Sequence, residues 1–207
     1  KIIYHVVEDI PQTVKNYKKG WSPNFFRENF HRNEISKPIE KCDPNDLILI
    51  SDADEIPNFE SIKNNKIKKF ALLSQKNFYY KLNLQSSNDW LGTGICYKKF
   101  LKSPQWLRNK RFLRRGFIRK LFFKTQIIPN AGWHFSFLKK PEEIVEKMKS
   151  YGHGELNHKA NVKSIETSIK SKKFFINENI KLNTVKIDET YPDYVRKNQN
   201  ILKDWII

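Results

Sequence analysis

The sequence predicts an α/β fold built on a mixed, mostly parallel sheet flanked by helices. Lys1–Val7 is suited to a buried strand, and Phe25–Cys42 carries apolar residues at the spacing of a helix. Leu47–Ser51, the run LILIS, is continuously apolar, as expected of a central parallel strand that is covered on both faces. Strand, helix and strand in this order form a βαβ pattern, which brings its two strands together in parallel.

Local signals predict the remaining elements along the chain. Asp43–Asp46 is a turn, and Ser103-Pro104 supplies the N-cap serine and first-turn proline that begin a helix. Pro141 is followed by two glutamates, which suit the positive end of a helix dipole. We expect strands at 70–84, at 92–100 and within 127–138, and helices at 59–68, 103–115, 141–151, 164–172 and 191–205. No repeat or low-complexity linker interrupts the chain, so a single domain over residues 1–207 is predicted.

Composition excludes two classes of protein. Hydrophobic residues make up 39% of the 207-residue chain, which excludes a disordered protein, and no stretch reaches the roughly 18–20 apolar residues of a membrane helix. Cys42 and Cys96 show no metal-ligand spacing, and two free thiols fit a reducing compartment, so a cytoplasmic location is expected. The chain begins with Lys1 rather than Met, so we expect further sequence upstream.

The formal net charge of +17 would attract nucleic acids, anionic membrane surfaces or phosphorylated substrates. Lysine is spread along the whole chain, however, as on an ordinary solvated surface, and no specific nucleic-acid binding is expected. The one dense basic segment is Arg108–Lys124, where arginines alternate with apolar residues. This segment could clamp a diphosphate, contact an acidic glycan or touch a membrane surface. The alternative is an amphipathic element with its aromatic side in the core.

The most informative segment is the acidic run that follows LILIS. Asp52 and Asp54 lie where open α/β sheets bind ligands, beyond the carboxyl end of a strand. Two carboxylates this close repel each other unless a cation neutralises them. Mg²⁺ and Mn²⁺ favour oxygen ligands and are usually held by one or two carboxylates together with substrate phosphates. The pair therefore predicts a divalent-metal site for a nucleotide diphosphate. The alternative is an acidic surface turn, or capping of the next helix by Asp54 and Glu55.

A second group of candidates follows the turn before Gly132. Trp133 could form an apolar platform for a sugar ring, and His134 could donate a hydrogen bond to a phosphate or to an acceptor hydroxyl. The alternative is a core tryptophan beside a hydrogen-bonded histidine. His153 lies between two glycines after a helix, where it could close on a ligand or be an exposed residue at the helix C-terminus.

Several segments together resemble glycosyltransferase family 17. The matching motifs, in chain order, are DLILISDADEIPN, FYYKLN, Trp90-x-Gly92, SPQWLR ending at Arg108, NAGWHFSF and PEEIVEKMKSYGHGE. NAGWHFS with a downstream H-x-E is much more specific than two acids separated by one residue. The similarity runs from about residue 28 to residue 157, with a weaker tail to residue 205. The family contains the β-1,4-mannosyl-glycoprotein β-1,4-N-acetylglucosaminyltransferases and many bacterial and viral relatives.

The resemblance implies a GT-A-like (Rossmann-like) fold, a UDP-GlcNAc donor, a glycan acceptor, a divalent metal (Mn²⁺ or Mg²⁺) and inversion at the anomeric carbon. It adds His153 to Asp52 and Asp54 as a third metal ligand, or as a phosphate contact. Trp90 and Arg108 lie in matching motifs and are expected to bind donor or acceptor. Members of the family usually carry an earlier strand and loop that help hold the nucleotide, which we expect upstream of the first residue.

An inverting transferase needs a base that takes the proton of the acceptor hydroxyl, which is typically worth about 10²–10⁴ in rate. Glu142, at the start of the helix after the GWHFS strand, is the first candidate, because acids at this position in GT-A folds often do this work. Glu143, Asp89 and Glu155 are alternates. A purely structural role for Glu142 is to complement the helix dipole.

Two other classes of protein remain open. A metal-dependent nuclease or phosphodiesterase would use the acids for metal and the basic segment for nucleic acid, but the sequence offers no clear second set of metal ligands. A non-catalytic carbohydrate-binding module derived from a transferase would lack the upstream nucleotide-binding part.

Overall fold

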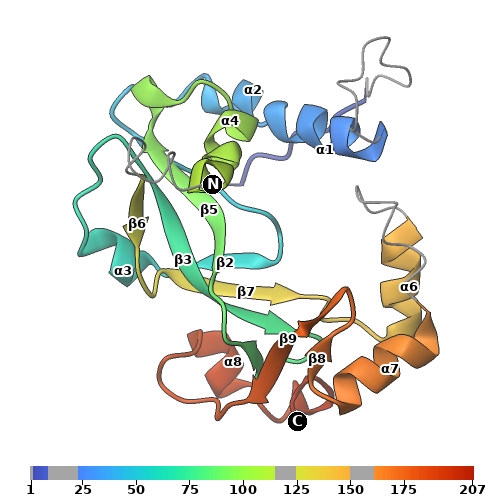
Figure 1. Ribbon diagram of the computed structural model, residues 1–207. Coiled ribbons are helices and arrows are strands. Elements are labelled where there is room, and N and C mark those ends of the chain that lie inside the picture. The colour runs from blue at the N-terminus through green and yellow to red at the C-terminus, as the bar shows by residue number, and fades with distance from the viewer. Residues whose placement is uncertain (1, 9–22, 115–124, 150–160) are drawn as a thin grey trace.

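The computed structural model describes residues 2–8, 23–114, 125–149 and 161–207, and a nine-stranded sheet forms its centre (Figure 1). The strands are β1 (Leu47–Ile50), β2 (Glu55–Pro57), β3 (Phe70–Tyr79), β4 (Leu84–Ser86), β5 (Trp90–Tyr97), β6 (Gln126–Ile128), β7 (Gly132–Ser136), β8 (Lys173–Phe174) and β9 (Asn177–Thr184). The α-helices are α1 (Pro23–Asn33), α2 (Ser36–Ile39), α3 (Phe59–Lys63), α4 (Pro104–Asn109), α6 (Pro141–Lys149), α7 (Val162–Lys170) and α8 (Asp193–Lys197). Short 3₁₀ helices are η1 (Lys98–Phe100), η2 (Lys110–Arg114) and η4 (Lys203–Trp205).

Strand β3 organises the sheet because it pairs along both of its edges. Its first half lies between β5 and β6, and its second half lies between β4 and β7. Beyond these neighbours, β1 pairs with β5, β2 with β7, and β9 with both β4 and β8. Among the described strands only the β3–β6 and β3–β7 pairs are parallel.

The predicted α/β fold with a mostly parallel, GT-A-like sheet is wrong, because six of the eight pairs between described strands are antiparallel. The segment LILIS, which was predicted to be a central parallel strand, forms β1. Within the described residues β1 pairs with β5 alone, and Leu47 is 41% exposed, so β1 is no central strand. Strand β5 runs antiparallel to both β1 and β3, so no βαβ crossover joins β1 to a parallel neighbour. The expected first strand is also absent, since residues 2–8 form no strand and Ile2 and Tyr4 are almost fully exposed.

Most other expected elements exist with shifted ends. The helical spacing at 25–42 is divided between α1 and α2, and the Ser-Pro signal begins α4, where Ser103 Oγ accepts a hydrogen bond from Trp106 N at 3.1 Å. The helix expected at 191–205 is shortened to α8, followed by η4. No helix in these described ranges is long and apolar enough to cross a membrane.

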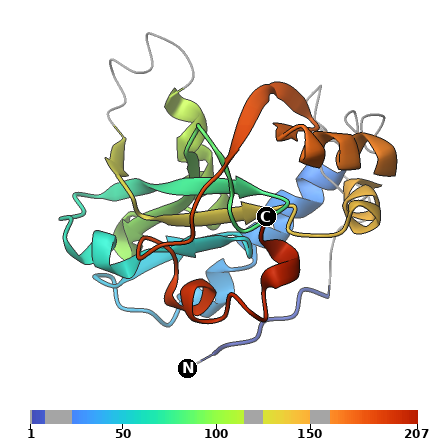
Figure 2. The same ribbon diagram turned by 90° about the horizontal axis from the view of Figure 1, so that it is seen from below.

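The two faces of the sheet carry different cores. On the first face, α3, α8 and the C-terminal residues cover β3, β6 and β7, and Leu73 and Phe78 are fully buried there. On the second face, α4 packs against β1 and β5 through Leu107, while α6 and α7 pack against the end of β3. Figures 1 and 2 show α4 and α6 standing apart from each other along the sheet.

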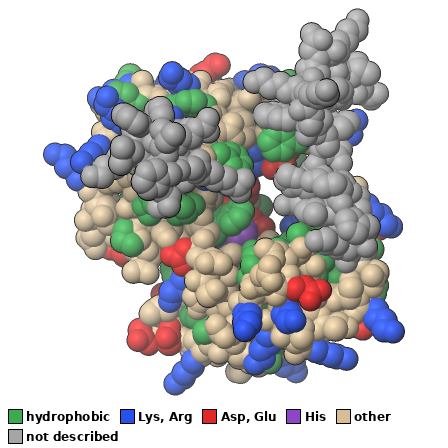
Figure 3. All heavy atoms as spheres, viewed as in Figure 1, with side chains coloured by type: hydrophobic (Ala, Val, Ile, Leu, Met, Phe, Trp, Pro, Cys, Tyr) green, Lys and Arg blue, Asp and Glu red, His purple; other side chains and the backbone are tan. Residues whose placement is uncertain are grey.

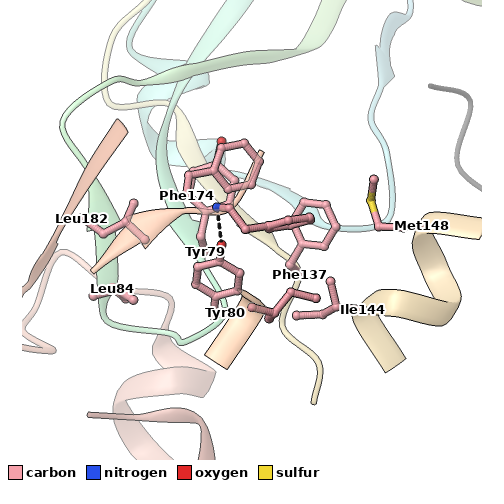
Figure 4. Close-up of a cluster of buried hydrophobic side chains, with 10 residues drawn as sticks. Tyr79, Tyr80, Leu84, Phe137, Ile144, Met148, Phe174 and Leu182 are labelled. Atoms are coloured by element: carbon pink, nitrogen blue, oxygen red, sulfur yellow. Dashed lines mark hydrogen bonds between the residues drawn. The ribbon is translucent and has the colours of Figure 1, made fainter. Parts of the chain in front are cut away.

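A cluster of buried side chains fixes α6 and α7 to the sheet (Figure 4). Tyr79 and Phe174 stack with their ring centroids 4.2 Å apart, and Tyr80 Oη accepts a hydrogen bond from Phe175 N at 2.9 Å. Ile144 of α6 points into this cluster and is completely buried. The cluster therefore ties the helix after β7 to the hairpin formed by β8 and β9.

Truncation of Ile144 tests this packing. We expect Ile144→Ala to lower the free energy of unfolding by about 2–5 kcal/mol, because it leaves a cavity in a closed core. Glu146→Ala on the exposed side of the same helix is the matched control and should change stability little. Denaturant unfolding measures both variants, and equal midpoints would contradict the packing described for α6.

Candidate functional site

A cavity of about 600 Å³ opens on the second face of the sheet, between η2 and α6. Figure 3 shows a hollow between the upper and lower parts of the molecule, with a histidine side chain visible inside it. The residues that line the cavity come from eight regions of the chain: Glu28, Asp52, Ala53, Asp54, Tyr79, Trp90, Arg111, His134, Ser136, Phe137, Lys147, Phe174 and Ile176.

Backbone pairing brings the acidic segment to this cavity. Glu55 is in register with His134 of β7, and Phe135 N donates a hydrogen bond to Asp54 O at 2.9 Å. Strand β7 runs beside β3, where Asn77 is in register with His134. Because paired residues project to the same face of a sheet, the side chains of Glu55, His134 and Asn77 all lie on the second face.

Glu55 forms the buried centre of the site. Arg108 binds both oxygens of its carboxylate, Nη1 with Oε2 at 2.9 Å and Nη2 with Oε1 at 2.8 Å. Trp90 Nε1 donates to Oε1 at 2.6 Å, and Thr93 Oγ1 donates to Oε2 at 3.0 Å. The side chains of Glu55 and Arg108 are only 0% and 1% exposed, so each charge depends on the other for stability away from water.

Gly92 allows β5 to approach this carboxylate. A Cβ atom at this position would lie 1.9 Å from Glu55 Oε1 and 2.1 Å from Trp90 Nε1, which is too close for any side chain. The Trp90-x-Gly92 motif therefore has a structural reason: the tryptophan donates to the carboxylate, and the glycine leaves room for it.

Asp52 is held by two arginines. Arg108 Nη2 binds Asp52 Oδ2, and Arg32 Nη2 donates to Asp52 Oδ1 at 3.1 Å. Arg32 also binds Glu28 Oε1 at 2.8 Å, which joins α1 to the site. A cation therefore faces each oxygen of Asp52, and its negative charge is largely neutralised by the protein itself.

Asp54 lies beside His134. Nδ1 of His134 lies 2.8 Å from Asn77 Oδ1, and because that oxygen can only accept, Nδ1 carries the proton and Nε2 faces Asp54 Oδ2 at 3.6 Å. Trp90 stacks on the imidazole, with centroids 4.5 Å apart and planes at 12°. Burial alone would raise the pKa of Asp54, but the neighbouring His134 and the charge of Lys147 outweigh it, so the pKa is lowered and the carboxylate is ionised at neutral pH.

Asp54 and His134 are the adjacent pair of possible metal donors in this cavity. Within the described ranges no three His, Cys, Asp or Glu side chains are grouped as for a metal ion. Because Nδ1 donates to Asn77, Nε2 is the ring nitrogen that His134 turns towards the carboxylate of Asp54, and it can ligate a cation when it carries no proton. Asp54 and His134 therefore fit a cation that takes its remaining ligands from water and phosphate oxygens, whereas Asp52 is already engaged by arginines.

Arg111 lines the cavity with unsatisfied donors. Its Nε and Nη1 are buried and have no hydrogen-bond partner in the described part of the chain. The guanidinium carbon lies 5.3 Å from the ring centroid of Trp90 and 4.8 Å from that of Phe112. Burial, together with the charge of Arg108, lowers the pKa of Arg111 to about 10, so it remains a cation at neutral pH. Such a side chain is suited to bind an anion in the cavity.

Trp133 does not join the other predicted site residues. Trp133 and His134 are consecutive in β7, so their side chains point to opposite faces of the sheet. Trp133 packs with the core of the first face, and its Nε1 donates to Thr190 O at 3.1 Å. Trp90 and His134 do line the cavity, while Arg108 lies buried behind it.

The acids expected to act as the base lie elsewhere. Glu142 is exposed in the first turn of α6 and does not line the cavity. Glu143 accepts a backbone hydrogen bond at the start of the same helix, and Asp89 is exposed on the loop before β5. Glu155 and the expected metal ligand His153 lie outside the described residues, so their roles stay predictions.

Sequence reasoning missed several residues of the site, among them Glu55 as its centre, Arg32, Asn77 and Glu28. One signal was available for Glu55, because a glycine inside a strand often marks a close approach by another part of the chain. No local pattern marked Arg32 or Asn77, whose roles depend on partners distant in sequence.

A profile of glycosyltransferase family 17 matches residues 1–175, a range that holds every residue lining the cavity except Ile176. Comparisons with curated proteins and with solved structures gave no significant match.

Removal of Arg108 tests the centre of the site. Arg108→Met should lower the free energy of unfolding by about 3–5 kcal/mol, because it leaves Glu55 buried without its counter-ion. Arg108→Lys keeps a positive charge but loses the two-pronged contact, so we expect an intermediate loss. Lys63→Met removes an exposed ion pair with Glu60 and serves as the control, with little expected change. If all three variants unfold at the same denaturant concentration, the ion pair is not a structural requirement.

Proposed function

Because the chain belongs to glycosyltransferase family 17, we propose that its cavity binds a nucleotide-sugar donor, UDP-GlcNAc, and that transfer to a glycan hydroxyl inverts the anomeric carbon. The protein is a glycosyltransferase, and such an enzyme takes a sugar donor and a glycan acceptor. The identity of the donor, the use of a metal and the inversion are the proposed parts.

The observation that carries the proposal is the unsatisfied guanidinium of Arg111 in a cavity that also holds Asp54 and His134. A diphosphate needs cationic donors, and Arg111 offers a forked, partly desolvated cation, with Lys147 on another wall of the same cavity. Trp90 and Tyr79 add aromatic surface. A volume of about 600 Å³ suits a ligand of nucleotide-sugar size.

A divalent cation, Mn²⁺ or Mg²⁺, would be held by Asp54 and His134. When bound, the metal would withdraw charge from the departing diphosphate. Asn77 orients His134 for this role by accepting a hydrogen bond from Nδ1. Asp52 contributes indirectly, since its contacts with Arg108 and Arg32 fix the loop that carries Asp54.

The remaining group is the base that takes the acceptor proton. In the described part of the chain, the carboxylates that line the cavity are Glu28, Asp52 and Asp54. Asp52 has an arginine against each of its oxygens, and Asp54 is assigned to the metal. Glu28 meets Arg32 through Oε1 alone, so its other oxygen, Oε2, is the proton acceptor that we assign. In the proposed step the acceptor oxygen bonds to the anomeric carbon as the bond from that carbon to the diphosphate oxygen breaks. The bonding electrons leave with the diphosphate, and the acceptor proton moves to the Glu28 carboxylate.

The metal assignment predicts a loss of cation affinity on substitution of Asp54. Asp54→Asn should weaken Mn²⁺ binding in the presence of UDP by at least the roughly 10–100-fold that loss of a supporting metal contact costs. Electron paramagnetic resonance of unbound Mn²⁺ measures this affinity without any turnover. Asp89→Asn, which changes an exposed carboxylate outside the cavity, is the control. Equal Mn²⁺ affinity of wild type and Asp54→Asn would refute the assignment.

The base assignment is tested by two glutamates compared in parallel. Glu28→Gln should bind UDP-GlcNAc normally but transfer sugar about 10²–10⁴-fold more slowly, as expected for loss of a general base. Glu142→Gln should transfer sugar at close to the wild-type rate, since Glu142 does not line the cavity. Single-turnover kinetics separate the two. The reverse pattern would return the role to Glu142.

A further inference from the structure

A second pocket lies on the first face of the sheet, opposite the cavity. Its volume is about 400 Å³, and Trp133 and Tyr191 form its aromatic part. Polar side chains complete it, including Asn58, Asn130 and Glu189. Because Trp133 follows the strand alternation away from His134, this pocket shares no lining residue with the cavity on the second face.

The aromatic part is fixed before any ligand binds. Trp133 Nε1 donates to Thr190 O at 3.1 Å, and Lys76 Nζ donates to Thr190 Oγ1 at 2.7 Å. Asp188 accepts from the backbone and hydroxyl of Thr190, which fixes the segment before Tyr191. A pocket held in this way loses little conformational freedom when a ligand enters.

Three polar groups of the pocket make no hydrogen bond within the described structure. Tyr191 is only 4% exposed, and its hydroxyl is buried without a hydrogen-bond partner. Asn58 uses its side-chain oxygen to cap α3, and within the described residues its Nδ2 makes no hydrogen bond. The amide of Asn130 is exposed to solvent and makes no hydrogen bond within the described residues, where only the backbone oxygen of Asn130 accepts, from Ser61. A buried hydroxyl without a partner, and two amides that can exchange water for a ligand, lie beside an aromatic ring and suit a ligand that offers hydroxyl groups.

This composition fits a neutral sugar better than an ion. The apolar face of a pyranose ring can lie on Trp133, while its hydroxyls bond to the amides of Asn58 and Asn130 and to the carboxylate of Glu189. The ammonium of Lys76 is engaged by Thr190, so the pocket presents no cation comparable with Arg111. An anionic ligand would meet the carboxylate of Glu189.

We propose that the pocket at Trp133 is a second saccharide-binding site, which holds one sugar unit of a glycan away from the site of transfer. The identification of this sugar as part of an acceptor or product glycan rests on the proposed function. Binding of the sugar itself does not, because the pocket lies on the other face of the sheet and requires neither donor nor metal.

The test measures binding of neutral oligosaccharides in the absence of donor and metal. Chitotriose, mannotriose and N-acetyllactosamine are titrated into the full chain, and saturation-transfer NMR and calorimetry report binding. Asn130→Gly removes the amide and suits the left-handed backbone of this position (φ 50°), and Asn58→Ser keeps the cap of α3. Each variant should weaken the affinity about two- to tenfold, as for one lost hydrogen bond.

Two comparisons make the result specific. Asn88→Ser, on an exposed loop outside the pocket, should bind the oligosaccharide as the wild type does. Arg111→Gln should also retain oligosaccharide binding while it weakens UDP-GlcNAc binding, so failure of the donor site and failure of this pocket are distinguishable. The proposal is overturned if none of the three oligosaccharides binds, or if Asn130→Gly and Asn58→Ser bind as tightly as the wild type.

Discussion

The buried ion pair between Glu55 and Arg108 is the interaction on which the rest of the site depends. It joins the start of β2 to α4, and through Trp90 and Thr93 it joins both to β5. A charge so deeply buried cannot be left without its partner, so these elements are held in one arrangement. That arrangement presents Asp52 and Asp54 to the cavity and turns Arg111, three residues after Arg108, towards the same space. A buried ion pair thus positions the charged side chains that line the cavity.

Side chains alternate along β7, so consecutive residues of this strand lie on opposite faces of the sheet. His134 faces the cavity, where Asn77 fixes its proton and Trp90 covers its ring. Trp133 faces the other side and forms the wall of a separate pocket. The adjacent residues Trp133 and His134 therefore line two different pockets, one on each face of the sheet. A glycosyltransferase that binds an extended glycan could use both pockets.

The sequence predicted which segments form the site, but it did not predict how these segments pair with one another in the fold. Asp52, Asp54, Trp90 and His134 were expected in it and do line one cavity, because motifs dense in polar and aromatic residues carry local signals. The parallel sheet was wrong because an apolar run such as LILIS fits a half-covered edge as well as a central strand. The pairing of Arg108 with Glu55 spans 53 positions, and no local periodicity reports such a contact.

The most direct measurement is a crystal structure of the protein with UDP-GlcNAc and Mn²⁺. The account predicts both phosphates in the cavity on the second face, within hydrogen-bond distance of Arg111, and anomalous scattering from Mn²⁺ beside Asp54 and His134. Phosphates bound instead in the open groove along α7 and β9, or in the pocket at Trp133, would contradict it.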